Sequence, residues 1–559
     1  MPCISLAQTR TVGVVHSEAG AYDGYTFFAP RSATRTFLVD MEGRLVHTWE
    51  SDYTVANPAY LLEDGSVLRT ATFGRGFSRF DAGGVGARVE QIDWDGELRW
   101  AFELAGDSAQ LHHDIEPLPN GNILMMAWVY KSRQEAIEQG RDSLLITDDG
   151  VWPEAIIEVR PTGDFGGEIV WQWNVWDHLV QDYDPGRPNY GDVSAHPELI
   201  DLNFAAERGK DWIHFNAIAY NAELDQILIS NRGFDEIWII DHGTTTEEAA
   251  GHTGGRYGRG GDLLYRWGNP AAYRAGTESD QQLFGQHDSH WIADGLEGEG
   301  RILLFNNGFR RPAGAYSSAD EVQPPQLPDG SYMWPASGEA FDPTEPFWSY
   351  TAPVPIEMYS AILSSAQRLP NGNTLICTGA WGTVIEITPT GEEVWRYVNP
   401  VVSDTVIVPQ YSQVPDEAFN RDANTIFRAY RFGPDHPALS GRDLTPGLTI
   451  EDGALSTSID HERPALLVDL GIDAAFPNPF HDSITFSLST ANPRHLQLVI
   501  VDVLGREVRR LVDDLLAAGP HQVNWNGTDD AGRRVAAGVY IAFLESDGHR
   551  IARTVTRIR

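Results

Sequence analysis

The chain has 559 residues, of which 79 are acidic and 41 are lysine or arginine, so its formal net charge is −38. So strong a negative charge repels phosphate backbones and anionic lipid surfaces, which argues against nucleic-acid binding and peripheral membrane binding. No apolar run approaches the ~18 residues that a membrane span needs, and the 54 glycines and 33 prolines favour many turns over long helices.

The N-terminal residues 1–10 read MPCISLAQTR. They lack the basic region and the length of a signal peptide, but the SLAQ stretch resembles the end of one. We therefore expect residues 1–10 to be the remnant of a signal peptide whose start is missing from this chain. Cys3 and Cys377 are the only cysteines, so we expect no cysteine-based zinc site and expect both thiols to be free.

A repeated pattern of short apolar strands and tight turns occupies residues 11–445. An apolar strand followed by an Asp-Gly or Asn-Gly turn recurs, for example as LLEDGSVL at 61–68 and LPNGNIL at 118–124. Six units end in a strand that carries a tryptophan: Trp49, Trp100, Trp171, Trp267, Trp348 and Trp395. These endings predict an all-β fold with a six-bladed β-propeller, whose blades repeat around a central channel. A large β-sandwich is the alternative, but it does not explain six matching endings.

Two parts of the chain depart from the repeat. The first unit has no inner strand before Val39, so either residues 424–432 or residues 11–15 must complete its sheet. After the repeat stops, residues 446–473 contain glycine, proline and aspartate and are predicted to form a linker. Residues 474–559 contain short strands in a different pattern, which predicts a small Ig-like β-sandwich.

Three histidines occupy similar places in separate units. When the repeats are aligned through their turns, His112, His214 and His287 fall at nearly the same depth on the inner strands. Because a strand alternates faces with period two, equivalent positions in successive blades point the same way, and the three imidazoles would meet at one end of the channel. Polar side chains that could orient these rings follow two residues later: Asp114, Asn216 and Ser289.

The same alternation places His113 and His290 on the opposite face, where they would support the blade. It also argues against a metal site at HDSH (residues 287–290), because residues three apart on a strand diverge, and we predict no metal site. The glycine-rich segment GHTGGRYGRGG at 251–261 lacks the ending of a phosphate-binding loop and is expected to be a flexible turn.

Cations and amides lie at the far ends of the same strands, among them Asn231, Arg232, Asn307 and Arg310. Guanidinium and amide donors beside imidazoles suit an oxyanion such as sulfate or phosphate, with a neutral imidazole that attacks or shuttles a proton. The alternative for each histidine is a structural hydrogen bond, and Arg310 could be a solvated turn residue.

Segments that together span most of residues 22–445 resemble the bacterial arylsulfotransferase family, the aryl-sulfate sulfotransferases that use no nucleotide donor. They include LHHDIEPLPNGNIL, DWIHFNAIAYNAELDQILIS, FGQHDSHW, ILLFNNGFRRP and EITPTGEEVWRYVNP. The resemblance implies a six-bladed propeller that moves a sulfuryl group from an aryl sulfate donor through a channel histidine to a phenolic acceptor. It implies no cofactor.

Matched residue by residue, the resemblance makes His214 and His287 assisting histidines and Arg310 the arginine that binds sulfate. The acceptor histidine is expected within residues 358–366, but that stretch contains none. Either His112, His214 or His287 then serves as acceptor, or transfer is direct, or the scaffold has another activity. Substrate binding is expected from Asn216, Asn231, Arg232, Asn307, Trp128 and Trp381.

Two other functions remain open. A secreted propeller could bind sulfated or other anionic ligands without turnover, and the missing acceptor histidine favours that alternative. A sulfatase-like hydrolase is the third, and it would release free sulfate without an acceptor.

Residues 475–559 resemble the C-terminal sorting domain of proteins exported by the type IX secretion system. The matching elements are FPNPF at 476–480, VDVLGREVRRLV at 501–512 and WNGTDDAGRRVAAGVY at 525–540. The resemblance implies the type IX machinery as a partner and passage through the periplasm to the surface or medium of a Gram-negative bacterium, with removal of the domain on the way out.

Overall fold

The computed structural model describes residues 10–74, 78–204, 209–417, 421–453, 455, 471–476, 478, 480–490, 493–502, 506–517, 519–546 and 549–558. Cys3 and nearly all of the predicted signal-peptide remnant lie outside these ranges. The chain divides into two compact units. One comprises Met1–Gly74, Ala82–Glu103 and Leu111–Leu455, and the other comprises Arg75–Asp81, Leu104–Gln110 and Ser456–Arg559.

Within the described residues, the first unit holds six antiparallel sheets of four or five strands. The first sheet is β31 (Ile426–Phe432), β2 (Tyr25–Pro30), β3 (Arg35–Val39) and β4 (Leu45–Glu50). The second is β5 (Thr54–Leu61), β6 (Val67–Thr72), β7 (Arg88–Ile92) and β8 (Leu98–Glu103). The third is β9 (Ala109–Pro117), β10 (Ile123–Val129), β11 (Glu154–Pro161) and β12 (Gly167–Asn174).

The remaining three sheets follow in chain order. The fourth is β15 (Phe215–Asn221), β16 (Gln226–Asn231), β17 (Glu236–Asp241) and β18 (Tyr265–Trp267). The fifth is β19 (His287–Trp291), β20 (Ile302–Asn306), β21 (Ser318–Val322) and β22 (Trp348–Tyr350). The sixth is β23 (Ser365–Arg368), β24 (Thr374–Thr378), β25 (Thr383–Ile387), β26 (Glu393–Val398) and β1 (Gly13–Ser17).

Smaller elements lie in the connections between these strands. They are α1 (Arg133–Glu138), α2 (Thr246–Ala249), β13 (Leu179–Val180), β14 (Ile200–Asp201), β27 (Val401–Ser403), β28 (Val406–Ile407), β29 (Asp416–Glu417) and β30 (Arg421–Asp422). No helix among the described residues is long and apolar enough to cross a membrane.

Local sequence explains why these segments form paired strands. β16 and β17 are buried along their whole length, as expected for strands that are packed on both faces. The Asn-Gly turns predicted from sequence connect β9 to β10 and β23 to β24, with Gly121 at φ +84° and Gly372 at φ +85°. Glycine adopts this left-handed conformation without a side-chain clash, so the turn is tight enough to join neighbouring antiparallel strands.

The six predicted tryptophans lie one in each sheet, on β4, β8, β12, β18, β22 and β26. The sequence repeat is therefore a repeat of sheets. β31 pairs with β2, so residues 424–432 supply the inner strand that the first unit lacks. Residues 11–15 instead contribute to β1, which pairs with β26 at the edge of the sixth sheet.

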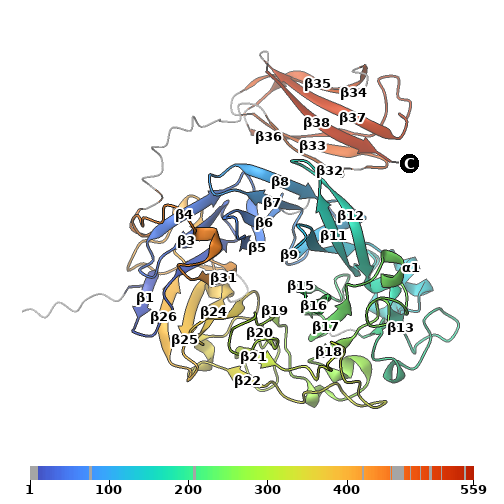
Figure 1. Ribbon diagram of the computed structural model, residues 1–559. Coiled ribbons are helices and arrows are strands. Elements are labelled where there is room, and N and C mark those ends of the chain that lie inside the picture. The colour runs from blue at the N-terminus through green and yellow to red at the C-terminus, as the bar shows by residue number, and fades with distance from the viewer. Residues whose placement is uncertain are drawn as a thin grey trace, which may run out of the picture. The chain divides into compact units, whose positions relative to one another are not determined.

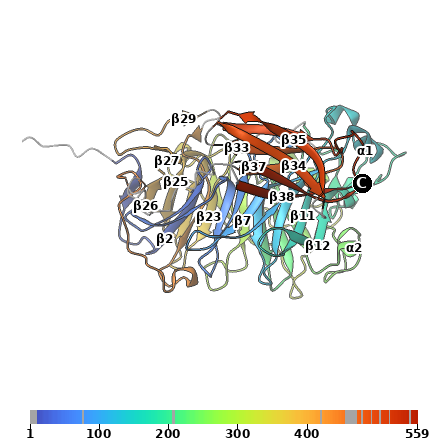
Figure 2. The same ribbon diagram turned by 90° about the horizontal axis from the view of Figure 1, so that it is seen from above.

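The six sheets follow one another around a circle in Figure 1, and Figure 2 shows the same sheets from above. β2 contacts β5, β10 contacts β15, β15 contacts β19 and β20 contacts β23. The second sheet meets the third where Gly86 N donates to Leu111 O at 3.1 Å. β24 contacts β31, so the sixth sheet packs on the first and the series closes.

The second unit has two sheets among its described residues. One is β32 (Gly471–Phe476), β33 (Ile484–Thr490) and β36 (Gly519–Trp525), and the other is β35 (Glu507–Leu516), β34 (Arg494–Asp502), β37 (Gly538–Ser546) and β38 (His549–Arg557). Buried residues from both sheets, including Phe486, Trp525, Leu498 and Leu544, form one apolar core. This is the packing of a small β-sandwich.

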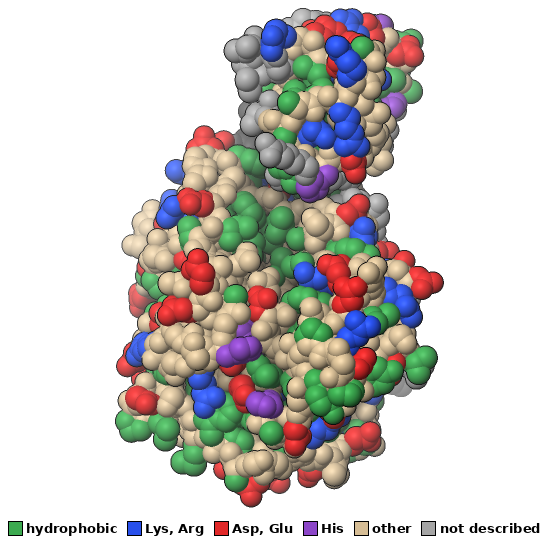
Figure 3. Space-filling model, turned by 90° about the vertical axis from the view of Figure 1, so that its right-hand side faces the viewer, with side chains coloured by type: hydrophobic (Ala, Val, Ile, Leu, Met, Phe, Trp, Pro, Cys, Tyr) green, Lys and Arg blue, Asp and Glu red, His purple; other side chains and the backbone are tan. Residues whose placement is uncertain are grey.

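The first unit extends further than the sequence predicts. Residues 446–453, predicted as the start of the linker, lie against β4 instead, because Gly447 N donates to Leu45 O at 2.8 Å and Ile450 is buried. Most of the remaining linker, 454 and 456–470, lies outside the described residues. Acidic side chains are scattered over the face of the first unit seen in Figure 3, so the negative charge is not gathered in one patch there.

Candidate functional site

A group of imidazole rings comes from the middle of β9, the residue before β15 and the first residue of β19. His113 has φ +44° and His214 has φ +57°, and Asp288 in β19 has φ +57°. A left-handed residue interrupts the alternation of a strand, so neighbouring side chains no longer point to opposite faces. His113 was predicted to face away from the other histidines, and this is wrong: its ring centroid lies 4.6 Å from that of His214.

His112 links this group to a buried carboxyl. Its Nε2 lies 2.6 Å from Oε2 of Glu154, and its Nδ1 lies 2.9 Å from Nδ1 of His113. Burial lowers the pKa of His112 to about 3 and the pKa of His113 well below its usual value. Burial also raises the pKa of Glu154 well above its usual value. The two rings are therefore neutral, and the carboxyl keeps its proton.

These protonation states determine which group donates in each hydrogen bond. Glu154 donates its proton to Nε2 of His112, so the proton of His112 is on Nδ1 and is donated to Nδ1 of His113. His113 must then carry its own proton on Nε2. His113 is then an N–H donor through Nε2, although it is a neutral ring.

His214 is the most accessible of these rings, with 15% of its side chain exposed, and it is held by Asp211. Its Nδ1 lies 2.5 Å from Oδ2 of Asp211, whose Oδ1 accepts a hydrogen bond from Nε1 of Trp128 at 3.1 Å. Burial favours a raised pKa for Asp211, but the charge and hydrogen bond of His214 outweigh it, and the pKa is lowered. Asp211 is therefore ionised and accepts the Nδ1 proton. Among the described residues, Nε2 of His214 has no hydrogen-bond partner.

His287 is oriented by an amide. Its Nδ1 lies 2.8 Å from Oδ1 of Asn307 and 3.1 Å from the carbonyl oxygen of Gly285, so the proton is on Nδ1 and Nε2 carries the lone pair. Burial lowers the pKa of His287 to about 3. The Phe427 ring, on β31, lies 6.2 Å from the His287 ring and 6.4 Å from the His113 ring. The imidazoles of His113 and His287, from two sheets, therefore lie on the same phenylalanine.

An arginine that was not among the predicted site residues lies next to this group. Arg428 on β31 is buried, and its guanidinium lies 2.6 Å from Asp114, 2.8 Å from Asp288 and 2.6 Å from the hydroxyl of Tyr60. Asp114 also accepts a hydrogen bond from Ile218 N at 3.0 Å. These two ion pairs link β31 of the first sheet to β9 of the third sheet and to β19 of the fifth. The sequence signal that could have indicated Arg428 is the presence of a charged residue within the apolar strand 426–432.

Several predicted substrate ligands make hydrogen bonds or ring contacts within the fold. Asn216 is buried, and its Nδ2 donates to Gln286 O at 2.7 Å. Asn231 is buried and accepts from Phe234 N at 3.1 Å. Asn307 donates its Nδ2 to Ser360 O at 2.7 Å, so both of its polar atoms are used. Trp128 is 0% exposed and stacks on His112 at 4.2 Å, so it supports that ring.

The predicted cations lie beside the His287 segment. Arg310 is exposed, and its guanidinium lies 4.8 Å from the centroid of the Phe309 ring, whereas that of the half-buried Arg232 lies 5.0 Å from the same ring. Phe309 N donates to Phe284 O at 3.0 Å. The two cations therefore flank one aromatic ring at the border of the imidazole group. Trp381 is half-buried and donates Nε1 to Tyr359 O at 2.5 Å.

Residues 358–366 hold serine hydroxyls where a histidine was expected. Ser364 donates to Ser360 Oγ at 2.9 Å, and Ser360 Oγ accepts from Ala380 N at 3.2 Å. Ser364 has φ +90°, a conformation that is costly for a residue with a side chain. Both serines are buried and satisfy neighbouring backbone groups.

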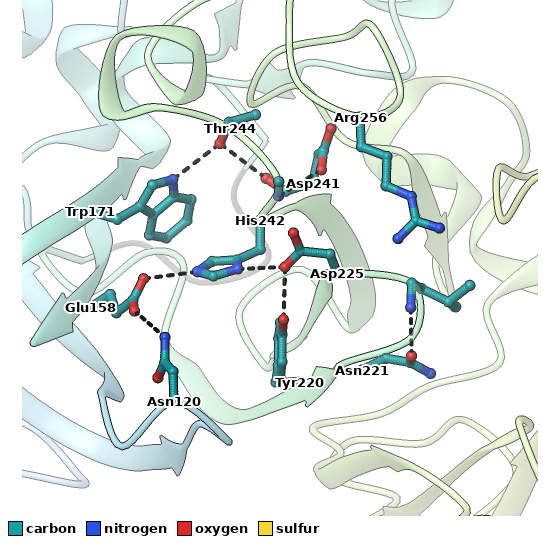
Figure 4. A network of polar contacts seen from close by, with 12 residues as sticks. Asn120, Glu158, Trp171, Tyr220, Asn221, Asp225, Asp241, His242, Thr244 and Arg256 are labelled. Carbon is teal, nitrogen blue, oxygen red and sulfur yellow. Dashed lines mark hydrogen bonds and ion pairs between the residues drawn. The ribbon is translucent and has the colours of Figure 1, made fainter.

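A separate network surrounds His242 (Figure 4). Its Nδ1 lies 2.7 Å from Oδ1 of Asp225 and its Nε2 lies 3.0 Å from Oε2 of Glu158. Burial alone would lower the pKa of His242, but the hydrogen bonds and charges of these two carboxylates outweigh it and raise the pKa to about 9. The ring borders a cavity of about 460 Å³ whose lining also includes Trp171 and Thr244. This histidine is a cation at neutral pH, unlike His112, His113 and His287.

Family models match parts of both units. The family model described as arylsulfotransferase (ASST) matches residues 12–410, and the model of the FlgD Ig-like domain matches residues 481–547. No curated protein matches the chain.

Among solved structures, a Bacteroides caccae protein of unknown function is 11% identical, with a TM-score of 0.39, over 73% of this chain and 99% of its own. A Staphylococcus aureus virginiamycin B lyase is 11% identical, with a TM-score of 0.30, over 75% of this chain and 95% of its own. Pseudomonas aeruginosa FlgD is 24% identical, with a TM-score of 0.12, over 13% of this chain and 60% of its own. The family match alone covers more than half of the chain, and the protein belongs to the arylsulfotransferase (ASST) family.

Proposed function

We propose that this protein is an aryl-sulfate sulfotransferase, that its six sheets are the blades of a propeller, and that His214 accepts the sulfuryl group. The observation that carries the proposal is the pair of Asp211 and His214. Because Asp211 accepts the Nδ1 proton, the neutral form of His214 holds its lone pair on Nε2, and this is the accessible nitrogen of the group. An imidazole oriented by a carboxylate is an activated nucleophile.

The first half-reaction is attack by Nε2 of His214 on the sulfur of the aryl sulfate. A nitrogen–sulfur bond forms, the bond from sulfur to the aryl oxygen breaks, and the phenolate leaves with the electron pair. The Nε2–H of His113, whose ring lies 4.6 Å from the His214 ring, is the donor proposed for a sulfuryl oxygen. Arg232 and Arg310 attract the anionic donor to the border of the site.

The second half-reaction returns His214 to its starting state. A phenol attacks the sulfur, the nitrogen–sulfur bond breaks, and the phenolic proton goes to a base. His287 suits that role because its Nδ1 proton is donated to Asn307 and Gly285, which leaves Nε2 as an acceptor. The buried ring is neutral at the pH of the reaction, as a base must be.

The test is turnover of p-nitrophenyl sulfate in the presence of phenol. Wild type is expected to release nitrophenol and form phenyl sulfate, and His214→Ala is expected to lose both. With phenol omitted, mass spectrometry is expected to find a sulfuryl adduct on His214. An adduct on another histidine, or unchanged turnover in His214→Ala, would contradict the assignment. His16→Ala, far from the imidazole group in sequence, is the control.

A binding protein without turnover is the second candidate, and the absence of histidine from residues 358–366 favours it. In that case calorimetry would detect aryl sulfate binding, weakened in Arg232→Ala, with no nitrophenol released. Release of free sulfate without phenol would instead indicate a hydrolase.

We propose further that residues 475–559 direct export by the type IX secretion system to the surface or medium of a Gram-negative bacterium. The FPNPF, VDVLGREVRRLV and WNGTDDAGRRVAAGVY elements support this proposal. A reporter fused before these residues, behind a signal peptide, is expected to leave a host that has the machinery. Retention of the reporter in the periplasm would contradict it.

A further inference from the structure

Two histidines and one aspartate meet between the outer strands of the third and fourth sheets. His178 follows β12, whereas His252 and Asp262 belong to the connection between α2 and β18. Nδ1 of His178 lies 2.9 Å from Oδ1 of Asp262, and Nδ1 of His252 lies 2.8 Å from the same oxygen. One ligand atom from each residue lies within 4.8 Å of the other two. The glycine-rich segment 251–261 contains His252 and ends next to Asp262. It therefore brings both residues to His178, which follows the last strand of the preceding sheet.

Nδ1 of His178 faces an acceptor oxygen of Asp262. Nε2 of His178 lies 2.8 Å from the carbonyl oxygen of Ala249, which only accepts, so Nε2 carries a proton. In a neutral ring, Nδ1 then has a lone pair, and this lone pair is directed at a carboxylate oxygen. Two acceptors at 2.9 Å repel each other unless a second proton or a metal ion lies between them.

The surroundings of His178 are those of a metal ligand. A metal-bound histidine usually donates its other N–H to a carbonyl or carboxylate, and Ala249 O fills that role here. The ring is buried and stacks on Trp173, at 5.4 Å between centroids and 7° between planes. Trp173 in turn donates Nε1 to Gly261 O at 2.7 Å. The orientation of the ring is therefore fixed before any ion binds.

The donor set and its exposure fit a zinc ion. Two imidazole nitrogens and a carboxylate oxygen are ligands that Zn²⁺ uses when a fourth position is left to water. Asp262 is nearly buried, but 58% of the His252 side chain is exposed, so solvent reaches the site from that side. Exposed histidines lie among acidic side chains on the face of the first unit drawn in Figure 3.

We propose that His178, His252 and Asp262 bind one Zn²⁺ ion, which fastens the outer edge of the third sheet to that of the fourth. Tetrahedral zinc with bonds of about 2.0 to 2.1 Å separates its ligand atoms by about 3.3 Å, so each close pair opens by about half an ångström on binding. The exposed His252 ring can make that movement on its side, and the Asp262 carboxylate must move away from the fixed His178 ring by the same amount. The site is independent of the imidazole group and of the proposed sulfuryl transfer.

The experiment uses the full-length chain, freed of metal with a chelator and titrated with Zn²⁺ by calorimetry. Wild type is expected to bind one ion per chain. His252→Ala removes an exposed ligand without disturbing the core, and is expected to weaken binding roughly a hundredfold or more, at least the effect of losing an outer-shell partner. Asp262→Asn is expected to weaken binding as well. His16→Ala removes a half-exposed histidine that lies 3.7 Å from Glu18, and it is expected to bind as wild type does.

Two further readouts keep the test decisive if Asp262→Asn fails to fold. Co²⁺ is expected to give the visible spectrum of a tetrahedral ion in wild type and in His16→Ala, but not in His252→Ala. Zn²⁺ is expected to raise the melting temperature of wild type and not of His252→Ala, because an ion that binds only the folded state stabilises it. No binding to wild type, or equal binding by His252→Ala, would overturn the proposal.

Discussion

Nδ1 of His214 lies 2.5 Å from Oδ2 of Asp211, and Trp128 donates to the other oxygen of the same carboxylate. In Asp211→Asn the tryptophan keeps the amide oxygen on its side, so the amide N–H₂ faces the histidine. The proton of His214 must then move to Nε2, which removes the attacking lone pair. We expect kcat for aryl sulfate to fall roughly 10³- to 10⁴-fold with little change in melting temperature. A loss of less than tenfold would show that the orientation of this ring does not matter.

At Glu154, unlike at Asp211, replacing the carboxyl group with an amide is expected to preserve activity. Because burial keeps Glu154 protonated, a glutamine can replace it with the same pattern, accepting from Phe215 N and donating to Nε2 of His112. Glu154→Gln is expected to retain kcat within a few-fold, whereas Glu154→Ala is expected to lose activity and stability together. If Glu154→Gln were as inactive as Asp211→Asn, the carboxyl would be ionised and the proton order in His112 and His113 reversed.

The position of His113 depends on a glycine of the preceding sheet. A Cβ built on Gly84 would lie 1.9 to 2.2 Å from three atoms of the His113 ring, and the residue has φ +80°. Gly84→Ala is expected to displace the ring, to lower kcat, and to cost about 1 to 3 kcal/mol beyond the backbone strain.

Gly96→Ala is the matched control, because Gly96 has φ +84° and no atom within 4 Å of its built Cβ. Both variants carry the same backbone strain of a left-handed alanine. The difference in their free energies of unfolding therefore measures only the clash with the His113 ring. Equal values for the two would contradict the described position of His113.

The sheets were predictable because strand periodicity, Gly turns and terminal tryptophans are local features of the sequence. The placing of His112, His214 and His287 on or next to the inner strands of three successive sheets followed from the same repeat. The position of His113 could not be predicted from the repeat, because one left-handed residue reverses the face of the strand on which a side chain lies. Arg428 was missed because its carboxylate partners are contributed by β9 and β19, more than 100 residues away in the chain. The roles of buried amides such as Asn307 depend equally on contacts that only the folded chain defines.

His242 is expected to make stability depend on pH. Its pKa is about 9 in the folded protein against 6.5 in its unperturbed state, so the charged ring stabilises the fold fully below pH 6.5. That contribution, at most about 3 kcal/mol, is lost as pH rises through 9. The difference in free energy of unfolding between wild type and His242→Gln should therefore be large at pH 6 and shrink toward pH 10. A difference that stays constant over this range would show that the ring is neutral in the folded state.

Arg428 is expected to matter more for folding than any cation at the surface. Its removal in Arg428→Met leaves the buried carboxylates of Asp114 and Asp288 without the guanidinium that they share, which should cost about 3 to 5 kcal/mol. The triple variant Arg428→Met, Asp114→Asn, Asp288→Asn removes the unpaired charges and should recover part of that loss. Arg310→Met, at an exposed position, should leave the free energy of unfolding within about 0.5 kcal/mol. Chemical unfolding of the three variants measures these values, and a loss in Arg428→Met no larger than that in Arg310→Met would refute the described ion pairs.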